Sequence, residues 1–338
     1  MDNDRALTSP ITVTPTITES DIADDPASLT EIFGRFLRLY VAEGDAPLKG
    51  IFVSPATMRT YHAQASQFVA WCRQHGLSPA AATETDIIAY RKHLVEAGYK
   101  PTTIGLKLAV VRRLFEAIRW RGLRHDNPAA GVKAPKDRTS RDERVKYLPL
   151  EGLRQLLAAP QGDGPLARRN RAILALMGLH GLRVAEVAGL QTDDIDLGTG
   201  EVKVLGKGRK IRTVHLIDHT VELLAAWLDV RQTLAMDGVS ALFVVAGPNG
   251  TGTALGARGI RYVVDRHLTE LGLKAEGISC HALRHSSATW ARAGGARLDA
   301  IAGMLGHASV TTTSIYARIV DRIAENPARY LEELIGLS

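Results

Sequence analysis

The chain has 338 residues, of which 45% are hydrophobic and 23% are charged, and this length and composition fit a soluble globular protein of two domains. No apolar run approaches the roughly 20 residues that cross a bilayer, and the N-terminus lacks the basic-then-apolar order of a signal peptide. The two cysteines are far apart in sequence and form neither a disulfide framework nor a four-ligand zinc site. We therefore expect a cytoplasmic protein rather than a membrane or secreted one.

The net charge of +6 is distributed unevenly along the chain. Residues 1–31 contain seven acids and one base, whereas residues 107–146 contain twelve bases and five acids. A concentrated positive region is what a surface that follows a phosphate backbone needs. Charge alone leaves open the alternative of a solvated helix face followed by a solvated linker.

The N-terminal part reads as a tail followed by four helices. Residues 1–27 are rich in Thr, Pro and Asp and predict a flexible acidic tail. A capping box at residues 28–31 begins the first helix, and Ser54-Pro55 begins the second, which runs to about His75. The third spans about 85–98, and the fourth follows Pro101 with apolar residues on one face. The pattern predicts a compact four-helix domain at residues 28–130 with one basic side.

The second part begins after a polar, charged segment at residues 131–147, which we interpret as a basic linker. Residues 201–205 and 211–216 alternate as strands, joined by a glycine-containing hairpin turn at 206–209. Helices are predicted at about 150–159, 169–177, 184–190, 218–235, 256–272, 279–293, 298–304, 310–319 and 324–335. We therefore expect a mainly α protein with a small antiparallel β-sheet.

The residues that can carry chemistry gather between His281 and Tyr316. Arg284 can bind two oxygens of one phosphate, and a tyrosine hydroxyl beside that phosphate can act as a nucleophile. His281 and Arg284 are three residues apart and share a helix face. The imidazoles of His281 and His307 can hydrogen-bond the phosphate or move protons. This combination suits chemistry at a phosphodiester.

Each of these residues also has a purely structural interpretation. Arg183 after a glycine turn and Lys207 at a hairpin tip are ordinarily solvated cations. Tyr316 alone would be a helix-packing aromatic. We assign His285 to helix packing or to the support of a neighbouring group.

Two other kinds of site do not fit. His281 and His285 have the spacing of zinc ligands, but Ala282 stands where a zinc hydrolase of the His-Glu-x-x-His kind carries glutamate. The phosphate-binding P-loop pattern also fails, because Lys207 is followed by Gly208 and position 201 is glutamate. We therefore expect neither a metal nor a nucleotide triphosphate as a cofactor.

Taken in order, these residues resemble the tyrosine recombinase (phage integrase) family of the Xer and λ-integrase type. The contexts that carry the resemblance are Gly181-Leu-Arg-Val-Ala-Glu-Val-Ala-Gly-Leu190, Gly206-Lys-Gly-Arg-Lys-Ile-Arg212, His281-Ala-Leu-Arg-His-Ser286, and Leu305-Gly-His-Ala-Ser309 with Tyr316. Asn127-Pro-Ala129 resembles the end of the family's N-terminal domain. The resemblance covers about residues 28 to 325 and is specific, because six separated positions agree in type and order.

The resemblance implies a core-binding (SAM-like) DNA-binding domain at residues 28–130, and a mixed α+β catalytic domain at 148–338. Together they would form a clamp around DNA. It implies a site-specific recombinase that cleaves and rejoins DNA strands through a covalent 3′-phosphotyrosine, without a metal or other cofactor. It also implies a homotetramer on two sites of double-stranded DNA.

The resemblance also implies a role for each catalytic residue. Tyr316 is the nucleophile, and Lys207 is the general acid that protonates the 5′-hydroxyl leaving group. Arg183 and Arg284 bind the non-bridging oxygens of the scissile phosphate, where negative charge builds up in the reaction. A free phenol has a pKa of about 10, and we expect the two arginines to favour its ionised form.

The remaining assignments concern support and DNA binding. His281 assists proton transfer and phosphate binding, His307 donates a hydrogen bond to the phosphate, and Glu186 steadies the site. Basic residues expected to contact DNA are Lys107, Arg112, Arg113, Arg119, Lys133, Lys136 and Arg209.

Two alternatives stay open from the sequence. A type IB topoisomerase uses a similar set of residues, although the small helical N-terminal domain and the short loop that carries Lys207 favour a recombinase. A DNA-binding accessory protein without catalysis is the other alternative, against which the complete residue set argues.

Overall fold

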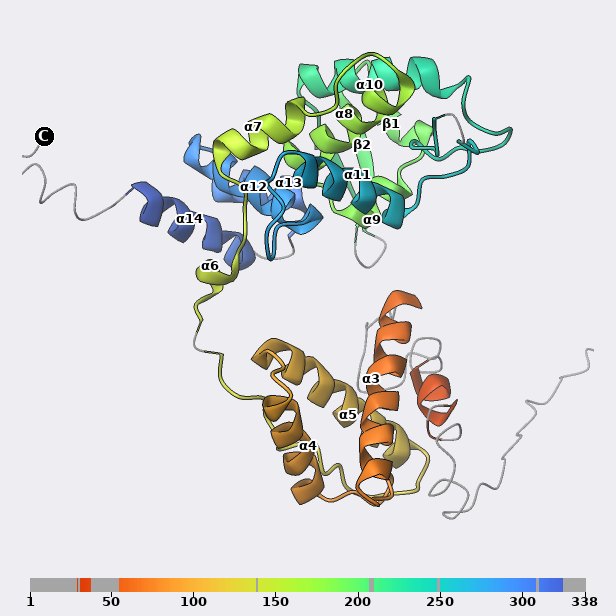
Figure 1. Ribbon diagram of the computed structural model, residues 1–338, viewed down its shortest axis with the longest axis vertical. Coiled ribbons are helices and arrows are strands. Elements are labelled where there is room, and N and C mark those ends of the chain that lie inside the picture. Colours follow the sequence, from red (N-terminus) through yellow and green to blue (C-terminus); the bar gives the residue numbers. More distant parts are fainter. Residues whose placement is uncertain are drawn as a thin grey trace, which may run out of the picture. The chain divides into compact units, whose positions relative to one another are not determined.

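The computed structural model of the protein describes residues 29, 31–37, 55–137, 139–206, 210–247, 250–307 and 310–324. These residues form a mainly helical structure with a three-stranded antiparallel sheet, which confirms the predicted fold class (Figure 1). The chain divides into two compact units, Met1–Arg138 and Thr139–Ser338. The division falls inside the segment 131–147 that the sequence analysis interprets as a linker. None of the described helices combines the length and apolar character that a membrane span requires.

Helices make up the N-terminal unit. They are α3 (Pro55–Gln74), α4 (Glu84–Glu96) and α5 (Pro101–Trp120), preceded by a helical segment at residues 31–37. Thr83 and Asp86 form a capping box at the start of α4, where the Asp86 carboxylate accepts the Thr83 backbone N–H at 2.8 Å. The predicted tail 1–27 and two residues of the predicted capping box, Ser28 and Thr30, lie outside the described residues.

Aromatic side chains fill the core of this unit. Phe68 on α3 meets Tyr90 of α4 edge-on, with ring centroids 5.1 Å apart, and Phe115 of α5 with centroids 6.1 Å apart. Phe33 and Phe36 from the helical segment 31–37 are also fully buried. Burial of such large apolar surfaces is the main driving force that holds the four helical pieces together.

The second unit is built around α8 (Pro165–Gly178), most of whose side chains from Ala167 onward are buried. The helices that contact it are α7 (Leu150–Ala158), α9 (Val184–Gly189), α10 (Asp218–Arg231), α11 (Ala257–Glu270) and α12 (Cys280–Ala293). α8 begins four residues before the predicted start at 169, because Pro165 occupies its first turn, where proline is favoured.

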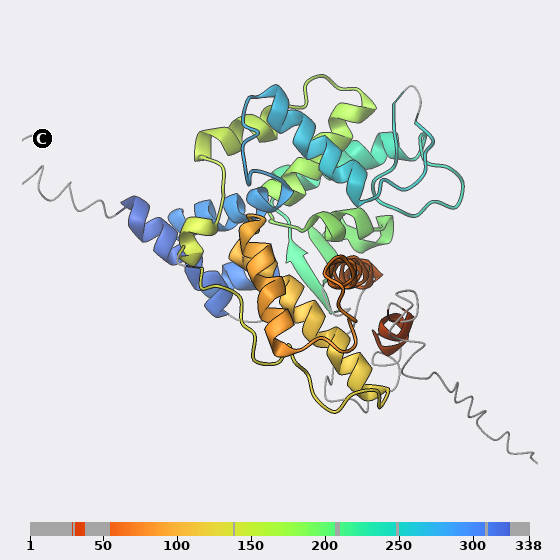
Figure 2. The same cartoon turned by 60° about the horizontal axis from the view of Figure 1, so that its bottom comes forward.

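The sheet has the order β1-β2-β3, with β1 at Ile195–Asp196, β2 at Glu201–Leu205 and β3 at Ile211–His215. The sequence does not predict β1, because a strand of two residues is too short to show alternation of apolar and polar side chains. β1 follows the short 3₁₀ helix η1 (Thr192–Asp194). Val202 and Val204 of β2 are fully buried, and β2 also contacts α9 (Figure 2). The predicted hairpin closes with a hydrogen bond from Gly206 N–H to Lys210 O at 2.8 Å. Its tip, residues 207–209, lies outside the described residues.

Two further helices, α13 (Leu298–Leu305) and α14 (Val310–Ala324), pack against α12, and the short α6 (Arg141–Arg144) contacts α14. α14 continues past residue 319, where the sequence analysis ends that helix, as far as Ala324. The predicted terminal helix at 324–335 lies, beyond Ala324, outside the described residues.

Candidate active site

A left-handed turn at Gly181 positions both candidate arginines. Gly181 has φ +64°, and a Cβ at this residue would lie 2.5 Å from Leu305 Cδ2, so a larger residue would be both strained and obstructed. Arg183 follows as the N-cap residue of α9. The Gly181 carbonyl accepts a hydrogen bond from Arg284 Nη1 at 2.6 Å. The same turn therefore sets the entry of α9 and anchors the guanidinium that comes from α12.

Arg284 is 2% exposed, and its Nη2 donates to the carbonyl of Leu305 at 2.6 Å. Arg183 Nη1 reaches the same carbonyl at 3.5 Å, so the two guanidinium groups meet at one acceptor. Burial, with a contribution from the nearby Arg183 charge, lowers the pKa of Arg284 to about 10. Arg284 therefore stays cationic at neutral pH.

A buried carboxylate connects Arg183 to the sheet. Glu186 accepts hydrogen bonds from Arg183 N–H and Nη1, both at 2.8 Å, and from Arg212 Nη1 at 2.9 Å and Nη2 at 3.0 Å. Burial opposes ionisation of Glu186, but the hydrogen bonds from Arg212 and Arg183 outweigh it and hold its pKa below the usual value. Arg212 itself was not among the residues that the sequence analysis selected, although it ends the quoted hairpin motif.

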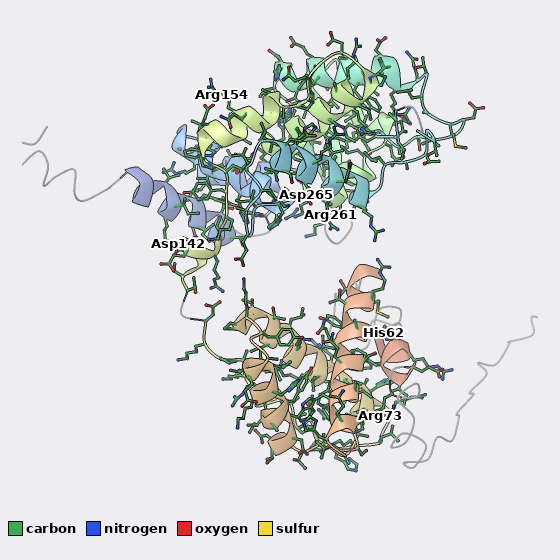
Figure 3. The ribbon with its side chains drawn as sticks, viewed as in Figure 1. His62, Arg73, Asp142, Arg154, Arg261 and Asp265 are labelled. Atoms are coloured by element: carbon green, nitrogen blue, oxygen red, sulfur yellow. The ribbon has the colours of Figure 1, made fainter. Side chains whose placement is uncertain are left out.

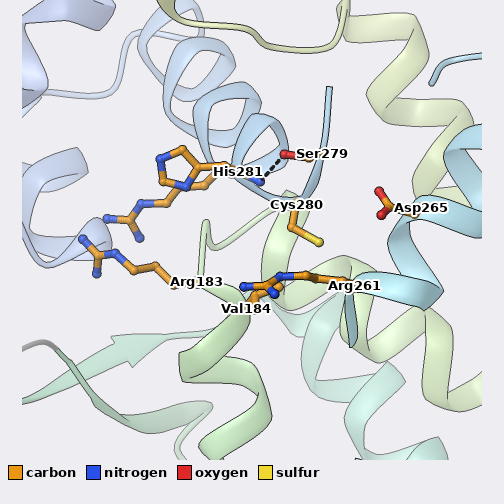
Figure 4. A pocket seen from close by; sticks show the side chains of 8 residues that line it. Arg183, Val184, Arg261, Asp265, Ser279, Cys280 and His281 are labelled. Atoms are coloured by element: carbon orange, nitrogen blue, oxygen red, sulfur yellow. Dashed lines mark hydrogen bonds between the residues drawn. The ribbon is translucent and has the colours of Figure 1, made fainter. Parts of the chain in front are cut away.

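A cavity of about 270 Å³ opens beside these groups. The residues that line it are Arg183, Val184, Arg261, Asp265, Ser279, Cys280, His281 and Arg284. Arg183 and His281 extend to the same side of the cavity, with Asp265 on the opposite side (Figure 4). Arg261 and Asp265 both come from α11 (Figure 3). Three of the predicted site residues thus line one polar hollow.

His281 is the second residue of α12, and its backbone N–H is capped by Ser279 Oγ at 3.4 Å. Partial burial and the charges of Arg284 and Arg183 lower the pKa of the imidazole. His281 is therefore neutral at pH 7 and can accept or donate a hydrogen bond at the cavity.

His307 follows a second left-handed glycine, Gly306, which ends α13 with φ +64°. A Cβ on Gly306 would lie 2.9 Å from the side chain of Arg212, so this turn and the Arg212–Glu186 pair are in close contact. The Nδ1 of His307 bonds the buried hydroxyl of Thr313 at 2.9 Å. Burial and the nearby cations Arg284, Arg183 and Arg212 lower the pKa of His307 to about 4.

Tyr316 is 2% exposed and packs among Ala288, Ile301, Leu305 and Ile319. Its hydroxyl is 2.9 Å from Nδ1 of His285, one residue after Arg284. Burial raises the pKa of Tyr316, although the charges of Arg284 and Arg183 act in the opposite direction. The two arginines act in the expected direction, toward the phenolate, but burial outweighs them and the net pKa of Tyr316 is raised.

The predicted DNA-binding lysine Lys107 needs a correction. It is 3% exposed, its ammonium donates to Gln64 Oε1 at 2.7 Å and to Gln67, and it lies 4.7 Å from the centre of the Tyr99 ring. Lys107 follows Ile104 by three residues, so helical spacing turns it toward the core side of α5. We therefore omit Lys107 from the proposed DNA-binding surface.

The other predicted contacts differ among themselves. Arg112 donates to the carbonyls of Ala129 and Val132, each at 3.2 Å, and Arg113 pairs with Glu116 at 2.5 Å. Arg112 thus connects α5 to residues 129–132, whereas Arg113 pairs within α5, and both are only partly exposed. The exposed members of the set are Arg119, Lys133 and Lys136. Lys207 and Arg209 lie outside the described residues.

Comparison with known proteins supplies independent findings. Residues 146–322 match the Phage integrase family, and residues 52–122 match the Phage integrase, N-terminal SAM-like domain. The chain is 33% identical to a tyrosine recombinase XerC of Pelobacter propionicus over 81% of this chain and 88% of the relative. It is 37% identical to a tyrosine recombinase XerC of Vibrio vulnificus over 66% of this chain and 67% of that protein.

Solved structures show the same fold. A XerH site-specific recombinase bound to a palindromic difH substrate matches with a TM-score of 0.66 and 22% identity, over 90% of this chain and 96% of that one. A lambda integrase dimer bound to a COC′ core site matches with a TM-score of 0.61 and 18% identity, over 85% of this chain and 76% of that one. The chain therefore belongs to the phage integrase family and is a tyrosine recombinase, a site-specific enzyme that cleaves and rejoins DNA.

Proposed function

We propose that Tyr316 is the nucleophile of this recombinase and that it forms a covalent 3′-phosphotyrosine with the cut strand. One observation carries the proposal: Arg183, His281 and Arg284 line one cavity, and Tyr316 is hydrogen-bonded to the residue that follows Arg284. Arg183 and Arg284 then bind the non-bridging oxygens of the scissile phosphate and offset the negative charge that develops there. The relatives favour neither the topoisomerase alternative nor the silent accessory protein.

The two exposed or half-exposed histidines at the site complete the phosphate contacts. His281 assists proton transfer and phosphate binding from the start of α12. His307 donates from Nε2 to the phosphate, with its Nδ1 accepting from the Thr313 hydroxyl. Glu186 keeps Arg183 and Arg212 in place beside the phosphate.

Lys207 is proposed as the general acid for the 5′-oxygen. The support is the position of the hairpin base: a Cβ built on Gly206 would lie 3.9 Å from Glu186 Oε1 and 3.5 Å from Arg212 Nη1. The loop that follows Gly206 therefore starts at the charged network around Glu186, within a short reach of the phosphate. A general acid positioned in this way raises the rate of the chemical step by about 10²- to 10⁴-fold.

We extend the proposal to the DNA complex. Residues 28–130 would bind one side of the duplex and residues 148–338 the other, with Arg119, Lys133, Lys136 and Arg209 among the phosphate contacts. Four protomers would assemble on two sites. The cytoplasmic location that two unpaired cysteines suggest also remains a prediction.

The experiment that tests the catalytic assignment uses a nicked suicide duplex, from which the cut end diffuses away. Its sequence is chosen by selecting duplexes that the protein protects from a random pool, and the nick is moved stepwise across the protected site. The protein should form a denaturant-resistant adduct, and Lys207→Ala should slow adduct formation while DNA binding stays near wild type. Equal loss of binding and cleavage in Lys207→Ala would overturn the general-acid role.

A further inference from the structure

His285 is the least explained member of the cluster. Its ring lies on α12 between His281 and Tyr316: the His281 ring meets it edge-on with centroids 4.8 Å apart, and the Tyr316 ring centre is 5.9 Å away. The one hydrogen bond that the described structure gives to the Tyr316 hydroxyl is the 2.9 Å contact with His285 Nδ1. A packing role explains the ring contacts but not a hydrogen bond between this ring nitrogen and a hydroxyl that must react.

The reaction requires a proton acceptor at this hydroxyl. A phenol attacks phosphorus slowly unless its proton leaves as the new bond forms. His281 faces the cavity from the first turn of α12, and His307 has its Nδ1 engaged by Thr313. His285 is within the distance that a general base needs, about 2.6–3.2 Å between heavy atoms.

We propose that His285 is a catalytic residue, the general base that accepts the phenolic proton of Tyr316 during strand cleavage. The proposal rests on Tyr316 being the nucleophile. As the Tyr316 oxygen bonds to phosphorus, its proton passes to His285 Nδ1. The bond from phosphorus to the 5′-oxygen breaks, and that oxygen keeps the electron pair and takes a proton from the general acid. In rejoining, the 5′-hydroxyl attacks, its proton returns to the acid, and His285 gives its proton back to the departing tyrosine.

The protonation state of His285 agrees with this role. Burial, together with the nearby His281, Arg284 and His307, lowers its pKa to about 4, so the ring is neutral when the protein is free. A neutral ring that accepts at Nδ1 carries its hydrogen on Nε2. The titratable groups that act on it are His281 and Arg284 on α12, His307 after α13 and Tyr316 on α14.

DNA binding changes the pKa of His285. A phosphate bound by Arg183 and Arg284 adds negative charge beside cations that otherwise disfavour a protonated His285. Its arrival raises the basicity of His285 and stabilises the histidinium that forms in the transition state. The free protein therefore holds Tyr316 as a buried, protonated phenol, and activation depends on the phosphate that is to be cut.

The test compares wild type, His285→Gln and His285→Ala in single-turnover cleavage of the nicked duplex between about pH 6 and 8. Glutamine keeps a polar side chain at Tyr316 but cannot take a proton. Wild type should reach a plateau, whereas both variants should be slower by about 10²- to 10⁴-fold. Their rates should also rise about tenfold per pH unit, because solvent then removes the proton. DNA binding should be unchanged, and His267→Gln, which alters a buried histidine of the same unit, should behave as wild type.

A second substrate separates the base from the acid. In a duplex with sulfur in place of the bridging 5′-oxygen, the leaving thiolate needs no proton. Lys207→Ala should recover on this substrate, and His285→Gln should stay slow. Recovery of His285→Gln, or a wild-type rate and pH profile in this variant on the ordinary duplex, would overturn the role of His285.

Different results refute Tyr316 as the nucleophile and His285 as the general base. An adduct formed by Tyr316→Phe refutes the nucleophile, whatever His285 does. A Tyr316→Phe variant without an adduct, beside a His285→Gln variant with wild-type kinetics, refutes the base alone. A wild-type rate that rises tenfold per pH unit over this range also refutes the base, and this measurement requires no variant to fold.

Discussion

Arg212 holds Glu186 through two parallel hydrogen bonds, from Nη1 to Oε1 at 2.9 Å and from Nη2 to Oε2 at 3.0 Å. The side chain of Arg212 is 15% exposed and that of Glu186 is 4% exposed, so both charges are largely removed from water. Arg212 Nε also donates to Met304 O at 3.2 Å. One side chain thus connects β3, the start of α9 through Glu186, and the end of α13.

The first prediction concerns this connection. Arg212→Lys keeps the positive charge but loses the planar fork that binds the carboxylate at two points. We expect the free energy of unfolding to fall by about 1–3 kcal/mol and cleavage of the nicked duplex to slow by about tenfold or more. Urea unfolding and single-turnover cleavage measure the two effects. Arg154→Lys, a change in an exposed pair with Glu151, is the matched control and should alter neither. Wild-type cleavage by Arg212→Lys would show that the network does not position the site.

The second prediction compares two glycines at the end of α13. Gly306 has φ +64° and meets the Arg212 side chain, whereas Gly303 is helical with nothing within 4 Å of an added Cβ. Gly306→Ala should lower the free energy of unfolding by about 1–3 kcal/mol, and Gly303→Ala should raise it by about 0.5–1 kcal/mol. Only Gly306→Ala should slow cleavage, because it displaces His307. Equal stability of the two variants in urea unfolding would show that the left-handed conformation of Gly306 does not disfavour a side chain.

Particular residues show what the sequence could predict. Arg183, His281 and Arg284 were identifiable because each lies in a short local motif, and the structure brings all three to one cavity. Lys107 was misassigned, although its spacing from Ile104 indicated the buried side of α5. Helical phase, and not charge alone, decides which lysines of a helix face solvent.

Other features depend on residues that are distant in sequence. The bond between His285 and Tyr316 spans 31 positions, and the pairing of Arg212 with Glu186 spans 26. No local pattern indicates which side chains will meet across such intervals. The raised pKa of Tyr316 has the same origin, because it follows from burial by Ile301, Leu305 and other residues of the assembled unit.

A third prediction concerns stability and pH. The pKa of His285 is about 4 when the protein is folded and about 6.5 in an unfolded chain. The unfolded chain therefore binds more protons between these values, and the free energy of unfolding falls as the pH falls through this range. From pH 7.5 to pH 5, wild type should lose about 2 kcal/mol more than His285→Gln. The lowered pKa of Glu186 changes the free energy of unfolding only below this pH range. Identical losses in urea unfolding of the two proteins would contradict the neutral, half-buried state of His285.

A fourth prediction concerns the DNA-binding surface. Lys133 and Lys136 are exposed, and neutralising each with glutamine should weaken binding to a duplex and reduce the slope of log affinity against log salt by about 0.9 per lost phosphate contact. Lys107→Gln should leave that slope unchanged and instead lower the stability of the N-terminal unit, where its ammonium binds Gln64. Fluorescence anisotropy over a salt series distinguishes the two. A reduced slope in Lys107→Gln alone would reverse the assignment.

Tyr316, as the proposed nucleophile, carries the cut DNA strand on its phenolic oxygen. The most direct measurement digests the trapped adduct with trypsin and nuclease and locates the remaining nucleotide by tandem mass spectrometry. We expect a 3′-nucleotide phosphate on the phenolic oxygen of Tyr316 in wild type, and no modified peptide in Tyr316→Phe. A nucleotide attached to any other residue, or an adduct that persists in Tyr316→Phe, would contradict this assignment.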